Sequence, residues 1–167
     1  VTSVALVSFQ SGKSNSRLQA AQREVAATIK LAQSYALQGK TQGGVMPCGY
    51  GFRFADADSY EIFSNPLSGY ANCTEQNKIA ANLQRNGNSI TTESFDLDNG
   101  VVLSTPISSF DNNSVDNVTE IYFTIPHANA YDKSGNSYSS NQNLTFDFAG
   151  TTKSITINIG GFVSEND

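Results

Sequence analysis

Several residue types are scarce in this chain of 167 residues. It has no tryptophan, one histidine, one methionine and four prolines. Charged residues make up 15% of the chain, and an excess of acidic over basic residues leaves a net charge of −5. This balance argues against a general nucleic-acid binder, because such a protein needs a basic surface. The length suits one domain that is large enough to bury a core.

Cysteine occurs only twice, as Cys48 and Cys73. Two cysteines without a cluster of histidines make no zinc site. The chain is rich in Asn, Ser and Thr, which is typical of an extracellular β-rich domain. In such a chain the two cysteines predict one disulfide bond, formed in an oxidising compartment. Closing that loop contributes about 3 kcal/mol in the chain-entropy model. Two unpaired thiols are the alternative.

The sequence contains no recognisable catalytic motif. His127 stands alone in the polar segment "IPHANAY", no serine lies in a G-x-S-x-G motif, and no glycine-rich loop precedes a helix. We therefore expect no enzymatic activity, no cofactor and no bound metal. The segment "DLDNG" places Asp96 and Asp98 at alternate positions, as in a calcium loop, but lacks the glutamate that should follow. A plain turn is the simpler interpretation, and calcium binding there stays open.

Long apolar runs are also missing, although a membrane helix needs about 20 such residues. Six of the first nine residues, "VTSVALVSF", are nevertheless apolar. This segment resembles the end of a longer apolar run. We therefore expect the chain to be either a processed form or a shortened piece of a longer protein.

The most regular feature is residues 17–40, "RLQAAQREVAATIKLAQSYALQGK". Apolar residues recur there at the spacing of a helix that packs one face on a core. Gly39 and the pair at 43–44 predict its end. Gly12, within the polar run 11–16, predicts a bend or local melting, because glycine costs about 1 kcal/mol relative to alanine in a helix. The residues expected to pack on a sheet are Leu18, Ala21, Val25, Ile29, Ala32 and Ala36.

After Gly44 the hydrophobic period changes to two, which indicates strands. The predicted strands are a hairpin of 49–54 and 59–64, then 89–97, 101–105 and 118–125, and a closing hairpin made by 144–150 and 153–163. The sequence therefore predicts an α+β fold, in which a long N-terminal amphipathic helix, residues 1–40, packs on an antiparallel β-sheet head, residues 41–167. Aromatic residues alternate along the predicted strands, so those on one face suit the core and those on the other face could form a glycan platform. These residues are Tyr122, Phe123, Phe146, Phe148 and Phe162.

Charge is divided unevenly between these two parts. Residues 1–40 hold five basic residues and one acidic residue, a formal charge of +4, whereas the remainder holds five basic and fourteen acidic residues, a charge of −9. A solvated face on each part is the simpler interpretation. Head-to-tail association of like subunits, with a basic helix against an acidic neighbour, is the functional alternative.

The order of these features resembles the type IV pilins and pseudopilins, and most closely the minor pilins and the H-type pseudopilins of type II secretion. In that group a helix leads straight into the first strand, as "TIKLAQSYALQGK" (28–40) does here, with Leu31, Ala32, Ser34, Ala36 and Gly39 in the expected places. "GYGFRF…YEIF" resembles the first hairpin of the group and "LDNGVVLS" (97–104) resembles a later strand. "ITINIGGFV" resembles the closing strand, except that Phe162 replaces an arginine.

The resemblance implies a non-enzymatic structural subunit of a type IV pilus or a type II secretion filament. Its partners would be other pilin or pseudopilin subunits in a helical filament. Residues 1–16 would be the end of the segment that lies in the membrane or in the filament core. Before assembly it would be held in the inner membrane of a bacterium by a single apolar segment upstream of this sequence, with its head outside the cytoplasm. After assembly it would lie on the cell surface or in the periplasm.

Two further functions remain as alternatives. The chain could be an extracellular adhesin or glycan-binding module that acts through the polar loop at 126–143. Some minor pilins of this type capture DNA with basic loops and tails. This chain ends in "SEND" and has an acidic head, so DNA capture ranks below the other hypotheses and no nucleic-acid partner is expected.

Overall fold

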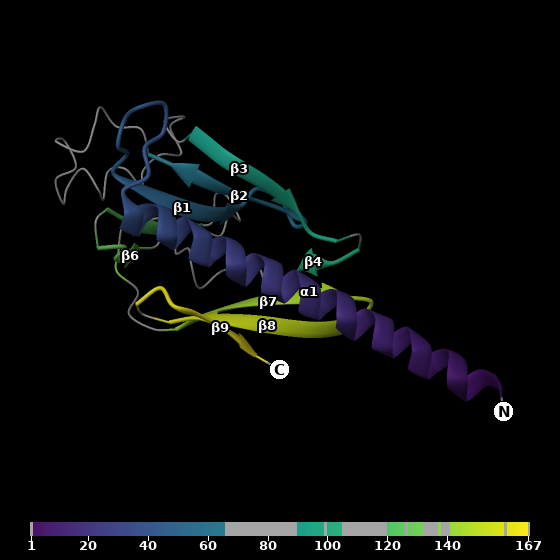
Figure 1. Ribbon diagram of the computed structural model, residues 1–167. Coiled ribbons are helices and arrows are strands. Elements are labelled where there is room, and N and C mark those ends of the chain that lie inside the picture. The colour runs from purple at the N-terminus through teal and green to yellow at the C-terminus, as the bar shows by residue number, and fades with distance from the viewer. Residues whose placement is uncertain are drawn as a thin grey trace.

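The computed structural model has, within the residues that it describes, one long helix followed by nine strands in two antiparallel sheets. It describes residues 2–65, 90–98, 100–104, 120–125, 127–131, 137, 141–158 and 160–166, with side chains from residue 12 onward. The helix crosses both sheets and contacts strands of each (Figure 1). The predicted α+β class, with a long N-terminal helix packed on antiparallel sheet, is thus confirmed.

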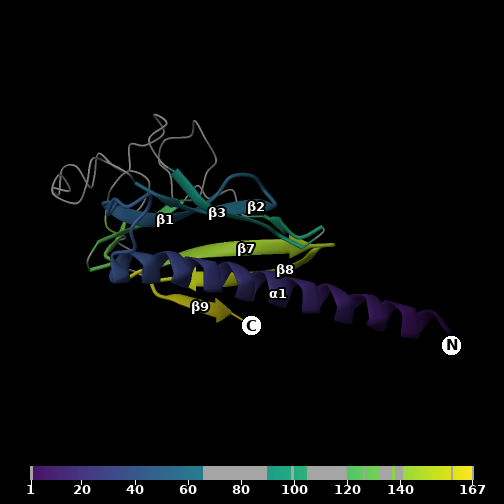
Figure 2. The same ribbon diagram turned by 45° about the horizontal axis from the view of Figure 1, so that its top comes forward.

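Helix α1 spans Thr2–Gln38, which are 37 residues and a length of about 55 Å. It is continuous through Gly12, so the predicted local melting there is wrong. A single glycine lowers the stability of a helix without breaking it, since the backbone hydrogen bonds on both sides persist. The N-terminal part of α1 projects well beyond both sheets, as the two views in Figures 1 and 2 show.

The helix ends at a glycine cap, where the sequence predicts it. Gly39 has φ +60°, the left-handed conformation that favours glycine. The N–H of Gly39 donates to the carbonyl of Ala36 at 3.2 Å, and the N–H of Lys40 donates to the carbonyl of Tyr35 at 3.1 Å. These two bonds form a Schellman motif, which satisfies carbonyls that the end of the helix would otherwise leave without partners.

The larger sheet has the strand order β3-β2-β1-β5-β6, with all neighbours antiparallel. Its first hairpin has the predicted bounds. The remaining strands are shorter than predicted or were not predicted at all. The five strands are β1 (Gly49–Phe54), β2 (Ser59–Ser64), β3 (Ile90–Asp96), β5 (Glu120–Thr124) and β6 (Ala130–Tyr131).

The smaller sheet has the order β4-β7-β8-β9. Its strands are β4 (Val102–Leu103), β7 (Gln142–Phe148), β8 (Thr151–Ile157) and β9 (Val163–Asn166). The strand predicted at 101–105 does not pair with β3 across the turn at 98–100. It shortens to β4 and pairs with β7 in the other sheet. The expectation of one sheet of roughly seven strands is therefore corrected, because the described part of the chain forms nine strands in two sheets.

The chain closes with three strands rather than the predicted two-stranded hairpin. The expected single strand at 153–163 is divided by a turn at residues 158–162, which separates β8 from β9. Asn158 organises this turn, because its side-chain oxygen accepts hydrogen bonds from the N–H groups of Gly160 at 2.9 Å and Phe162 at 3.0 Å. Gly161 has φ +78°, which lets the backbone reverse there.

The core lies between α1 and the inner faces of both sheets. The larger sheet contributes Tyr50, Phe52 and Ile62, among others, and the smaller sheet contributes Leu144 and Ile155, all fully buried. The two sheets are also joined by backbone. The N–H of Leu103 in β4 donates to the carbonyl of Ala57, in the turn between β1 and β2, at 2.8 Å. One core thus serves the helix and both sheets.

Tyr50 links the core to the end of the helix. Its hydroxyl donates to the carbonyl of Lys40 at 2.8 Å, and its ring packs edge-on against Tyr35 with centroids 5.5 Å apart. Burial, together with the neighbouring Tyr35, raises the pKa of Tyr50 from 10.0 to about 12. Burial also raises the pKa values of Tyr60 and Tyr122.

We expect the free energy of unfolding to fall as the pH rises from 10 to about 12. Over that range the unfolded chain releases the tyrosine proton and the folded chain retains it, so proton release favours unfolding. Urea unfolding at pH 9 to 11.5 measures this slope. The variant Tyr50→Phe should show a shallower fall, and a slope identical to that of the parent would contradict the assignment.

Candidate assembly interface

The inner face of α1 attaches the helix to the head. Leu18, Val25 and Ile29 are fully buried in the common core. The alanines on this face have no bulky side chain, which lets the helix approach the sheets closely. All six residues expected to pack on the sheet are at most 1% exposed: Leu18, Ala21, Val25, Ile29, Ala32 and Ala36.

Gln22 is a buried polar residue on the same face of α1. Its amide nitrogen donates to the carbonyl of Ser154 in β8 at 2.6 Å and to the carbonyl of Asn166 in β9 at 2.8 Å. Gln22 therefore ties the helix to the two last strands of the chain. Sequence reasoning missed this role, because the helical periodicity predicts which face is buried but not which polar group on it finds partners.

The outer face of α1 is exposed along the length of the head. Arg23, Ala27 and Lys30 lie on it. Of the five basic residues at 1–40, three make an ion pair with an acidic residue of the head: Arg17 with Asp98 at 3.7 Å, Arg23 with Glu165 at 3.6 Å and Lys40 with Glu93 at 3.8 Å.

These pairs change the interpretation of the uneven charge. Part of the opposite charge of helix and head is paired within one subunit, so less of it is left for a neighbour. Exposed pairs of this kind contribute about 0–1 kcal/mol each. Lys13 and Lys30 are exposed, and neither has an ion pair with the described residues. Together with Arg23, whose side chain is 63% exposed, they are the basic groups on the exposed surface of the helix.

A compact cluster joins the end of α1 to β3. The hydroxyl of Tyr35 donates to a carboxylate oxygen of Glu93 at 2.5 Å. The ammonium of Lys40 lies over the ring of Tyr35, 3.3 Å from its centroid, and pairs with Glu93. The cluster holds the edge strand β3 against the helix, so its charges serve the fold.

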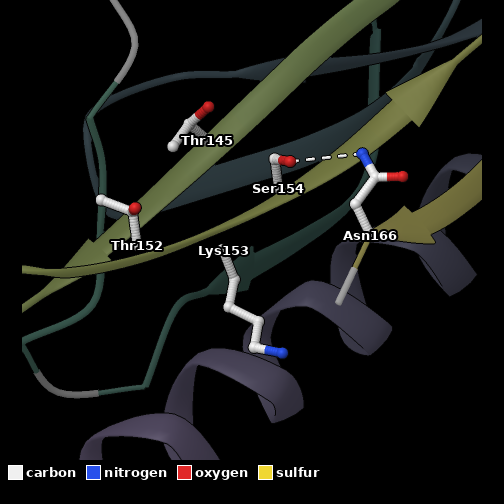
Figure 3. Close-up of a pocket in the computed structure, with 5 residues that line it drawn as sticks. All are labelled: Thr145, Thr152, Lys153, Ser154 and Asn166. Carbon is white, nitrogen blue, oxygen red and sulfur yellow. Dashed lines mark hydrogen bonds between the residues drawn. The ribbon is translucent and has the colours of Figure 1, made fainter.

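The outer face of the smaller sheet is polar. The register places Thr145, Ser154 and Asn166 opposite one another on β7, β8 and β9, so their side chains lie on one face. The alternate residues of the same strands, such as Leu144 and Ile155, face the core. These three residues, with Thr152 and Lys153, line a pocket of about 300 Å³ (Figure 3).

The other predicted residues are dispersed. Cys48 is buried just before β1 and is not a free thiol, whereas Cys73 lies outside the described residues, so the Cys48–Cys73 pairing stays a prediction. His127 is exposed. Asp98 pairs with Arg17, and no group of three His, Cys, Asp or Glu residues that could hold a metal ion occurs among the described side chains.

The aromatic residues do not form the glycan platform that was considered as an alternative. Tyr122, Phe123 and Phe146 are fully buried and Phe148 is half-buried. Phe162 is 66% exposed but stands at the turn before β9. The segment 126–143, which was expected to be a loop, contains the short strand β6 (Ala130–Tyr131). Its last two residues belong to strand β7 (Gln142–Phe148).

In the part of the chain that the structure describes, no helix is long and apolar enough to cross a membrane.

The similarity of this chain to known proteins lies in its fold. No protein-family model and no curated protein matches the sequence. The structure is similar to the crystal structure of the type IV minor pilin FimU from Pseudomonas aeruginosa, with a TM-score of 0.53 and 12% sequence identity. The match covers 92% of this chain and 90% of that one. The chain has a pilin-like fold. At 12% identity the similarity shows the fold alone, which the two chains share over most of their lengths.

Proposed function

We propose that this pilin-like chain is a non-enzymatic structural subunit that assembles with other pilin-like subunits into a filament. One observation carries the proposal. Helix α1 buries one face against the head from Leu18 to Ala36, whereas its N-terminal part projects beyond the sheets (Figure 2). A projecting helix fused to a compact head suits a helical filament, in which helices gather at the axis and heads form the surface.

On the basis of the sequence resemblance we propose a more specific role and location for the subunit. The subunit belongs to a type IV pilus or to a type II secretion filament, as a minor pilin or pseudopilin. An apolar segment upstream of this sequence holds it in a bacterial membrane before assembly. The head lies outside the cytoplasm, where a Cys48–Cys73 disulfide forms, and the assembled subunit reaches the periplasm or the cell surface.

Photo-crosslinking in the bacterium that makes the protein tests the assembly. A photoreactive amino acid replaces Ala27, which is exposed on the outer face of α1. In filaments sheared from the cells, we expect adducts between this position and other filament subunits, because the helices pack together. The readout is a mass shift on an immunoblot, followed by identification of the adduct by mass spectrometry.

The matched control carries the same photoreactive group at Ser164, which is exposed on the outer face of the smaller sheet. It should give few adducts, since that face points away from the helix. Absence of the protein from the filament fraction would overturn the proposed assembly. Equal adducts at both positions would overturn the arrangement with helices inside and heads outside.

A further inference from the structure

The polar pocket on the smaller sheet has no role in the assembly described above. Its lining comes from three neighbouring strands, with Thr145 on β7, Thr152, Lys153 and Ser154 on β8, and Asn166 on β9 (Figure 3). Four of the five side chains end in a hydroxyl or a carboxamide. We propose that this pocket binds one neutral sugar residue of a glycan.

Hydrogen bonds orient the groups that would meet the ligand. The amide nitrogen of Asn166 donates to the hydroxyl of Ser154 at 3.2 Å and to that of Thr156 at 2.7 Å. The hydroxyl of Thr156 in turn donates to the amide oxygen of Asn143 at 2.6 Å. This chain of bonds crosses β9, β8 and β7, so it holds the Asn166 side chain in one orientation.

These hydrogen bonds leave both a donor and an acceptor available to a ligand at the pocket. The nitrogen of Asn166 is occupied as a donor, and its side-chain oxygen remains as an acceptor. Ser154 accepts a bond from Asn166 and still has its own proton to donate. Thr152 is exposed and can do both. A sugar hydroxyl donates and accepts at one atom, which matches this arrangement.

The charge at the pocket disfavours an anionic ligand. Lys153 is the only charged residue of the lining, and its register opposite Phe146 places it on the core side of the sheet. Figure 3 shows its side chain pointing toward α1, away from Thr145, Ser154 and Asn166. An anionic sugar or a phosphate would therefore find no cation directed at it by these lining residues.

The size of the pocket suits a single ring. Small-molecule pockets run from about 300 to 1,000 Å³, and this one, at about 300 Å³, lies at the lower limit.

Val102, which is 38% exposed, pairs with Asp147, and Asp147 pairs with Thr152, so the register places Val102 on the same outer face. It offers an apolar surface to the C–H groups of a neighbouring ring of the glycan.

The position of the pocket keeps it accessible in a filament. The outer face of the smaller sheet lies opposite α1, so a filament with its helices at the axis leaves this face at the surface. This step rests on the proposed function, whereas binding of a sugar by the isolated chain does not. A test on the isolated chain therefore separates the two proposals.

The experiment is an NMR titration of the whole ¹⁵N-labelled chain with five uncharged sugars, namely the methyl glycosides of glucose, galactose, mannose, N-acetylglucosamine and N-acetylgalactosamine. We expect at least one of them to shift the amide signals of Thr152, Ser154 and Asn166, with a dissociation constant on the order of 1 mM. Because the ligand is neutral, raising the NaCl concentration should leave that constant unchanged.

Variants locate the site. Ser154→Ala and Thr152→Val should each weaken binding at least tenfold. Ser164→Ala, which alters the same outer face away from the pocket lining, should bind like the parent. No shift with any of the five sugars, shifts that persist in Ser154→Ala, or binding that falls steeply with salt would each overturn the proposal. The spectrum of every variant also reports whether it is folded, so unfolding cannot be mistaken for lost binding.

Discussion

Replacing Ile29 with aspartate is expected to unfold the head. Ile29 is fully buried in the centre of the inner face of α1, within the core that the helix shares with both sheets. Aspartate there would place an unpaired charge in an apolar environment, and leaving a charge buried without a partner costs about 3–5 kcal/mol. Removal of the buried isoleucine side chain costs about 2–5 kcal/mol more. A domain of this kind has a total stability of about 5–15 kcal/mol, so the two losses together remove much or all of it.

Circular dichroism with urea unfolding measures this effect. The matched control is Ala27→Asp, since Ala27 lies two residues away on the exposed outer face. It introduces the same charge and should change stability by about 0.5 kcal/mol or less. A folded Ile29→Asp variant with the stability of Ala27→Asp would show that α1 does not hold the head together.

Replacing Gly49 with alanine is the second change with a large expected effect. Gly49 begins β1 and pairs with Thr124 in β5. A Cβ atom at this position would collide with the backbone carbonyl of Phe123 and with the ring and hydroxyl of Tyr122. The carbonyl belongs to the neighbouring strand and cannot rotate away as a side-chain end could. We expect a loss of about 3 kcal/mol, the upper part of the usual range for overpacking.

Gly12→Ala provides the comparison, because nothing lies within 4 Å of a Cβ atom built there. It removes a glycine from the interior of α1 and should stabilise the helix by about 1 kcal/mol. The two glycine-to-alanine changes are thus expected to have opposite signs in the same urea assay. If Gly49→Ala were as stable as the parent, β1 and β5 could not be packed at the observed separation.

The ion pairs show how the tertiary structure changes a conclusion drawn from composition. The basic character of residues 1–40 suggested an attraction between subunits. Arg17, Arg23 and Lys40 instead contact acidic residues of their own head. In the proposed assembly, the shape of the projecting helix therefore counts for more than a general attraction between a basic and an acidic part. The exposed basic side chains of the helix are Lys13, Arg23 and Lys30.

The features that depend on local pattern could be predicted from the amino-acid sequence. The 3.6-residue period identifies the buried face of α1 from Leu18 to Ala36, and Gly39 marks its end. The two-residue period identifies the hairpin of β1 and β2 with its observed bounds. These predictions hold because the side chains of one helix face or one strand face are placed by their spacing along the chain.

The features that depend on contacts between segments distant in sequence could not be predicted in this way. The tertiary structure separated the strands into two sheets, moved β4 into the second, and divided the closing segment at Asn158. It also brought Gln22 to Ser154 and Asn166, residues more than 130 positions away, and assembled the polar pocket from β7, β8 and β9. The physical reason is that strand register and helix placement are set by packing of the whole core, which no local pattern encodes.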